Sequence, residues 1–92
     1  MNDKFVKELA KAIVSIEDPK LAEAFLSNIL TPADLEEISL RLQIFKLLFK
    51  GMPQREVAQK LGVSIGTVSR GSRELKYGEP GMKVILAKDG NA

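Results

Sequence analysis

The chain has 92 residues, which suits one small domain, and its 45% hydrophobic and 28% charged residues are ordinary for a globular protein. It has no cysteine, no histidine, no apolar run near the ~20 residues of a membrane span and no signal-peptide core, so we expect a cytoplasmic protein without disulfides or a membrane partner. Residues 1–40 hold four basic and eight acidic residues whereas residues 41–76 hold eight basic and two acidic ones, which favours a polyanionic partner but also fits a solvated basic face.

Two helices are predicted before residue 31. Phe5, Leu9 and Ile13 recur at helical spacing, so residues 3–15 are expected to form an amphipathic helix. The second helix begins after Asp18, a good N-cap residue, because proline at position 19 suits a first turn. We expect it to end near residue 30.

A third helix is predicted to begin at Thr31 and Pro32 and to end at Gly51, which can adopt a left-handed conformation. Its apolar residues cover much of its circumference; they are Leu35, Ile38, Leu42, Ile44, Phe45, Leu47, Leu48 and Phe49. In so small a domain this surface exceeds what one partner helix would cover. A second copy of the chain is therefore a natural partner, and a compact monomeric core is the alternative.

Residues 54–61 and 64–76 are predicted to form two helices that meet at Gly62, a pattern typical of a helix-turn-helix. The outer face of the second helix contains Gly66, Thr67, Arg70, Arg73 and Glu74, with Ser69 beside it. Short polar residues at the start of such a helix let its backbone approach base edges in a major groove, and Arg55 is placed to reach a phosphate or a guanine. A generic helical hairpin is the alternative reading.

The expected fold is all-α, with about six short helices in one domain over residues 1–92. Residues 1–50 would supply dimerisation helices, residues 54–76 the helix-turn-helix, and residues 77–92 a short C-terminal segment. Within that segment we expect a short helix over residues 82–87 and a frayed end over residues 88–92. No nucleophile–base constellation can be assembled, so the sequence predicts neither catalytic residues nor a metal site, and not an enzyme.

Residues 30–76 resemble the tryptophan repressor family. The matching stretches are LTP at 30–32, Arg41, LL at 47–48, Gly51, QRE at 54–56, LG at 61–62, TVSRGS at 67–72 and LK at 75–76. The resemblance implies an intertwined homodimer that binds an operator in double-stranded DNA as a transcriptional repressor. It also implies that a corepressor, L-tryptophan, lies between the recognition helix and the partner subunit.

The resemblance assigns tentative roles to individual residues. The resemblance and the outer face of the second helix together indicate five DNA-binding residues, which are Arg55, Ile65, Gly66, Ser69 and Arg73. For the small-molecule amino acid it implies a site made of Leu30 and Thr31 from the other chain together with Arg41, Thr67, Arg70, Gly71 and Glu74. Arg41 and Arg70 would flank the indole ring, and Arg70 would meet the carboxylate.

Some features depart from the family pattern or allow two explanations. Gly71 inside a helix costs about 1 kcal/mol relative to alanine, so either a flat ligand or close helix packing should require it. Glu74 stands where the family has a small hydroxyl residue, and it could pair with a ligand ammonium or repel a ligand carboxylate. The connector at residues 51–54 is one residue shorter than the family's, which would re-aim the next helix.

Two alternatives to a corepressor-dependent repressor stay open. The stretch YGEPG at residues 77–81 resembles a sister branch of repressor-like proteins, which favours a DNA-binding regulator that needs no ligand. The other alternative is a helical protein-interaction module whose basic helices bind an acidic protein surface instead of DNA.

Overall fold

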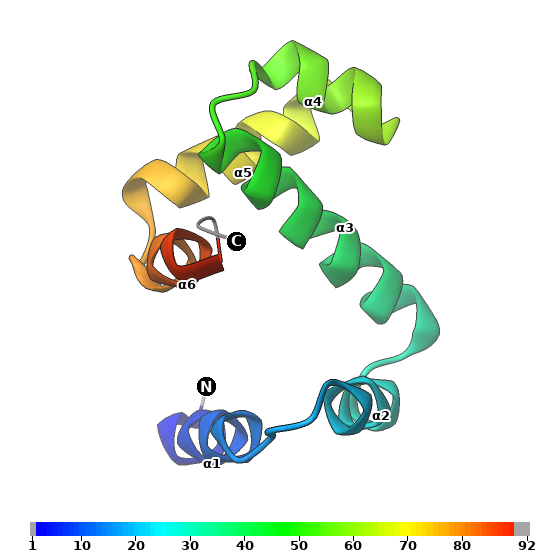
Figure 1. Cartoon of the computed structure of the whole chain (residues 1–92), viewed down its shortest axis with the longest axis vertical. Coiled ribbons are helices and arrows are strands. Elements are labelled where there is room, and N and C mark those ends of the chain that lie inside the picture. The colour runs from blue at the N-terminus through cyan, green and yellow to red at the C-terminus, as the bar shows by residue number, and fades with distance from the viewer. Residues whose placement is uncertain (1, 90–92) are drawn as a thin grey trace. The chain divides into compact units, whose positions relative to one another are not determined.

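The computed structural model describes residues 2–89, which form six α-helices and no strand (Figure 1). The helices are α1 (Asp3–Val14), α2 (Pro19–Ile29), α3 (Pro32–Phe49), α4 (Gln54–Leu61), α5 (Ile65–Tyr77) and α6 (Gly81–Asp89). The all-α prediction is confirmed, and the predicted helix ends differ from the observed ones by only one or two residues. None of the described helices is long and apolar enough to cross a membrane.

Side-chain caps explain why the helices begin where they do. The Oγ1 of Thr31 accepts a bond of 3.1 Å from the backbone N–H of Asp34, and a carboxylate oxygen of Asp34 accepts one of 3.4 Å from the N–H of Thr31. Ser64 caps α5 by accepting a bond of 3.1 Å from the N–H of Thr67, and Asp18 caps α2. Each cap satisfies a backbone donor that has no partner within its helix and contributes about 1 kcal/mol.

The chain divides into two compact units, residues 1–36 and residues 37–92. The first unit contains α1, α2 and the start of α3, and no residue of α1 or α2 is fully buried in it. Phe5, for example, is 66% exposed. The expectation that residues 1–92 act as one domain, with residues 1–50 as dimerisation helices, stays a prediction.

The second unit has its core where α3 meets the two helices of the helix-turn-helix. Ile44 of α3, Val57 of α4 and Val68 of α5 are almost fully buried there. Partly buried side chains pack around them; these are Leu47, Leu48, Met52, Ala58, Leu61 and Val63. This core fixes α4 against α5 and holds both on the C-terminal half of α3.

The turn between α4 and α5 depends on Gly62. This residue has the left-handed conformation, with φ +68°, which glycine adopts without steric cost. The backbone N–H of Val63 then donates to the carbonyl oxygen of Ala58 over 3.1 Å, which closes the end of α4. The predicted role of Gly62 in the turn is thus confirmed.

The C-terminal helix differs from the sequence prediction. Helix α6 extends over Gly81–Asp89 rather than residues 82–87, so the expectation that residues 88 and 89 are frayed is wrong. Leu86 is only 4% exposed and anchors α6, while no proline or glycine interrupts the helix between Gly81 and Asp89. The remainder of the predicted frayed end, residues 90–92, lies outside the described residues.

Large apolar side chains remain exposed on several described helices of the single chain. On α3, Ile38 is 45% exposed, Leu42 38% and Phe49 41%. On α6, Val84 and Ile85 are more than half exposed. The second unit therefore leaves much of the apolar circumference of α3 uncovered, as the sequence predicts.

Candidate DNA interface and ligand cleft

The first turn of α5 is open to solvent. Ile65 is 51% exposed although it is apolar, and a β-carbon added to Gly66 would meet only the hydroxyl of Ser64, at 3.8 Å. Val68 and Ser72, further along α5, are buried. The N-terminal turn of α5 is thus exposed and has no side-chain bulk at Gly66, which suits close approach to base edges.

Two arginines on the helix-turn-helix have no partner within the part of the chain that the structure describes. Arg55 on α4 and Arg73 on α5 are both exposed, and neither side chain forms an ion pair or a hydrogen bond there. Their charges are therefore free for an external anion. This arrangement is compatible with the DNA-contact roles predicted for both residues, and those roles stay predictions.

Ser69 has a role that the sequence did not indicate. Its hydroxyl donates a hydrogen bond of 2.8 Å to the side-chain oxygen of Gln54, in a part-buried position. This bond joins the start of α4 to the middle of α5 and so helps to set the angle between the two helices. The predicted DNA contact at Ser69 would have to share a hydroxyl that is already engaged.

A cleft of about 300 Å³ lies between α3 and α5, within the second unit. Its lining residues are Glu37, Leu40, Arg41, Ile44 and Phe45 from α3 and Thr67, Arg70, Gly71 and Glu74 from α5. The structure therefore brings together the five predicted ligand residues of the second unit. Leu30 and Thr31 belong to the first unit and do not line the cleft, so their assignment to a partner's site stays a prediction.

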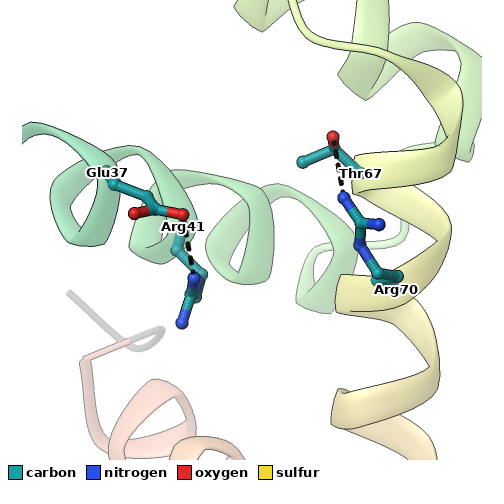
Figure 2. A network of polar contacts seen from close by, with 4 residues as sticks. All are labelled: Glu37, Arg41, Thr67 and Arg70. Carbon is teal, nitrogen blue, oxygen red and sulfur yellow. Dashed lines mark hydrogen bonds and ion pairs between the residues drawn. The ribbon is translucent and has the colours of Figure 1, made fainter. Parts of the chain in front are cut away.

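The two cleft arginines come from opposite walls, as Figure 2 shows. Arg41 forms an ion pair of 3.3 Å with Glu37, one turn earlier on α3. Both side chains are more than half exposed, so this pair contributes little to stability. Arg70 donates a long hydrogen bond of 3.5 Å to the hydroxyl of Thr67, a weak contact that leaves most of its donors free.

Gly71 is in direct contact with the α3 wall. A β-carbon at this position would lie 3.0 Å from Cγ2 of Ile44 and 3.9 Å from Cε1 of Phe45. Close helix packing therefore accounts for the glycine without any ligand. The same close approach makes Ile44 and Phe45 the floor of the cleft.

Several cleft residues are absent from the sequence predictions. Glu37 could have been found, because it precedes Arg41 by four residues and such pairs meet on one helix face. The sequence indicates Ile44 and Phe45 only as part of a long apolar helix, and it assigns no role to Leu40. A second hollow of about 330 Å³, lined by Arg70, Arg73, Glu74, Tyr77 and Gly78, adjoins the same two charged residues of α5. Among the described residues, no group of three or more acidic side chains is placed to hold a metal ion.

Comparison with known families identifies the chain. A family model described as Trp repressor protein matches residues 4–89, which is nearly the whole chain. The chain belongs to the Trp repressor family. The resemblance seen in residues 30–76 is thus confirmed and extends to the helices on either side.

Individual members of the Trp repressor family support the same conclusion. A Trp operon repressor homolog from Vibrio parahaemolyticus is 38% identical over 71 residues, which cover 76% of this chain and 69% of that protein. One from Haemophilus influenzae is 41% identical over 68 residues, covering 73% and 66% respectively. A crystal structure of a TrpR-like protein from Eubacterium eligens has a TM-score of 0.86 and 30% identity, covering 95% of this chain and 90% of that one.

Proposed function

We propose that this member of the Trp repressor family is a sequence-specific DNA-binding transcriptional repressor. The observation that carries the proposal is the outward first turn of α5, where Ile65 is exposed and Gly66 is unobstructed. Arg55 and Arg73 stand exposed on the same helix-turn-helix without partners in the described chain. Such a motif places its second helix in the major groove while arginines reach guanines or phosphates.

The charge distribution supports DNA as the partner. Residues 41–76 hold eight basic and two acidic residues, and they include both helices of the motif. Phosphate neutralisation by such residues supplies most of the affinity for DNA of any sequence and makes that affinity fall steeply with salt.

We propose further that the regulator acts as a homodimer. Large apolar side chains are exposed on α1, α3 and α6 of the single chain, and exposed apolar surface of this kind is typical of sites where proteins associate. A two-fold symmetric dimer would bind two half-sites about one helical turn, ~34 Å, apart on a pseudo-palindromic operator.

The cleft between α3 and α5 is the proposed ligand site, and an aromatic amino acid such as L-tryptophan is the proposed corepressor. Arg41 and Arg70 on opposite walls could stack on a ring, and guanidinium–ring contacts contribute about 0.5–2 kcal/mol each. A regulator that needs no ligand is the second candidate. It is favoured by the contact between Gly71 and Ile44, which explains the glycine by packing alone.

A binding assay on randomised DNA tests the proposal. Duplexes retained by the full chain at about 100 mM salt would be selected, sequenced and measured by fluorescence anisotropy with and without 1 mM L-tryptophan. We expect one enriched pseudo-palindrome and a steep loss of affinity with added salt. A gain in affinity with L-tryptophan would support the corepressor, and equal affinities would favour the ligand-free regulator. No retention of any duplex would contradict DNA binding and favour a protein-interaction module.

A further inference from the structure

The start of α4 is held to α5 by one hydrogen bond. The hydroxyl of Ser69 donates to Oε1 of Gln54 over 2.8 Å, and both side chains are half-buried. Within residues 2–89 this is the only side-chain hydrogen bond between the two helices. The N-cap residue of α4, Pro53, forms no capping hydrogen bond through its side chain, so the bond to Ser69 is the main tether of this first turn.

The rest of α4 is fixed by different means. Its C-terminal end joins α5 through the turn at Gly62, and Val57 in its middle is fully buried in the core. Apolar packing has no preferred direction, so it defines the rotation of the first turn of α4 only weakly. A hydrogen bond depends on direction as well as distance, and the bond between Ser69 and Gln54 therefore sets this rotation.

The rotation of the first turn matters because Arg55 follows Gln54 directly. Successive residues of an α-helix lie about 100° apart around its axis, so holding Gln54 against α5 sets the direction in which Arg55 leaves the helix. Arg55 is exposed and has no partner in the described chain. The other proposed DNA-contact element, the turn with Ile65 and Gly66, belongs to α5. The hydrogen bond thus connects the two elements that one DNA duplex must meet at a fixed spacing.

The same bond limits what Ser69 can do for DNA directly. A serine hydroxyl has one proton to donate, and that of Ser69 is donated to Gln54. Phosphate oxygens accept hydrogen bonds, so a hydrogen bond donated by Ser69 to the DNA backbone would break the bond to Gln54. Ser69 is therefore better placed to hold α4 than to contact DNA.

We propose that Ser69 is a positioning residue for DNA recognition, which acts through Gln54 on Arg55 and makes no DNA contact of its own. The bond holds the guanidinium of Arg55 at the spacing from the first turn of α5 that the operator requires. Loss of the bond leaves every charge of the helix-turn-helix in place. The affinity for DNA of any sequence then stays the same while the preference for the operator falls. This inference rests on the proposed DNA-binding function.

A double-mutant cycle on DNA affinity tests the inference. Anisotropy titrations with the selected operator and a scrambled duplex would compare the native chain, Ser69→Ala, Arg55→Ala and the double variant. We expect Ser69→Ala to weaken operator binding about three- to tenfold, the scale of one neutral hydrogen bond, and to leave binding of the scrambled duplex unchanged. In the Arg55→Ala background Ser69→Ala should have no further effect, because the residue through which Ser69 acts is absent.

Three further variants separate positioning from folding. Ser69→Thr keeps the hydroxyl and should retain the operator preference. Gln54→Ala should reproduce the effect of Ser69→Ala, and it decides the question if Ser69→Ala does not fold. Ser27→Ala, at an exposed position of α2 outside the helix-turn-helix, is the matched control and should leave both affinities unchanged.

The possible failures of the inference and of the proposed function are distinguishable. Equal losses of operator affinity from Ser69→Ala in both backgrounds would show a direct DNA contact and overturn the inference alone. Equal losses on the operator and the scrambled duplex, or an unchanged operator preference, would overturn it too. A native chain that binds no duplex would overturn the proposed function and the inference together.

Discussion

Cγ2 of Ile44 lies 3.0 Å from the point that a β-carbon on Gly71 would occupy. Ile44 is 2% exposed and packs with Val57 and Val68 in the core of the second unit, so it cannot easily move away. The glycine thus permits α5 to approach α3 closely at the position where the cleft begins. Helix packing and cleft shape depend on the same contact.

Gly71→Ala should therefore lower the free energy of unfolding by about 1 kcal/mol. Alanine gains about 1 kcal/mol in helix propensity, but overpacking against a buried side chain costs about 1–3 kcal/mol. Ile44→Leu removes Cγ2 and should make the same substitution at residue 71 neutral or stabilising. Urea denaturation of the native chain, the two single variants and the double variant at one protein concentration measures this cycle. Equal effects of Gly71→Ala in both backgrounds would show that the contact with Cγ2 of Ile44 does not determine how far the substitution lowers the free energy of unfolding.

Arg55→Ala should weaken binding to the selected operator by about 1–3 kcal/mol if the guanidinium contacts a guanine through two hydrogen bonds. A contact to phosphate alone would weaken all duplexes alike and reduce the slope of the salt dependence by about one. Anisotropy titrations on operator and scrambled duplexes separate the two cases. Lys88→Ala on α6 is the charge-matched control, and identical losses in both variants would argue against a specific role of Arg55.

The dimer can be tested through the exposed face of α3. Sedimentation equilibrium at low micromolar concentration should give about twice the chain mass of 10.1 kDa. Leu42→Glu places a charge on the uncovered apolar face and should shift the equilibrium to monomer or unfold the chain. Gln43→Glu introduces the same side chain at an exposed polar position next to it and should remain dimeric. A well-folded native monomer at this concentration would contradict the proposed dimer.

Ser69→Ala should lower the free energy of unfolding by about 1 kcal/mol, because the part-buried side chain of Gln54 loses its donor. Gln54→Ala alone should cost a similar amount, and the double variant should cost less than the sum. Thermal unfolding monitored by circular dichroism gives the stabilities. If the hydroxyl of Ser69 contacted DNA instead of Gln54, its substitution would weaken operator binding without changing the free energy of unfolding.

Local rules in the sequence were enough to predict most of the helices. Thr31, Asp18 and Ser64 are residues whose side chains cap helices within their own turn, so their effect can be read without knowing the fold. Gly62 likewise has its effect within the turn that it occupies. The helix-turn-helix can be predicted, and the resemblance of residues 30–76 recognised, for the same reason: both depend on short, contiguous stretches of sequence.

Contacts between distant segments were not predictable in this way. Nothing near Ser69 in the sequence indicates that its hydroxyl meets Gln54, fifteen residues away. The sequence alone does not show why residue 71 is glycine, because a bound ligand and a closely packed helix would both require a residue without a side chain at this position. The length of α6 was underestimated because burial of Leu86, which anchors the helix, is a tertiary effect.

A substitution at the floor of the α3–α5 cleft has a different cost for folding from a substitution at its rim. Ile44 and Phe45 are both cleft floor and hydrophobic core, so a change that reshapes the floor also lowers the stability of the helix-turn-helix. Glu37, Arg41 and Glu74 are exposed and belong to no core cluster, so they can be exchanged at little cost to folding. Substitutions at the rim can therefore change the charges that line the cleft while the apolar floor, and with it the placement of α5 against α3, stays as it is.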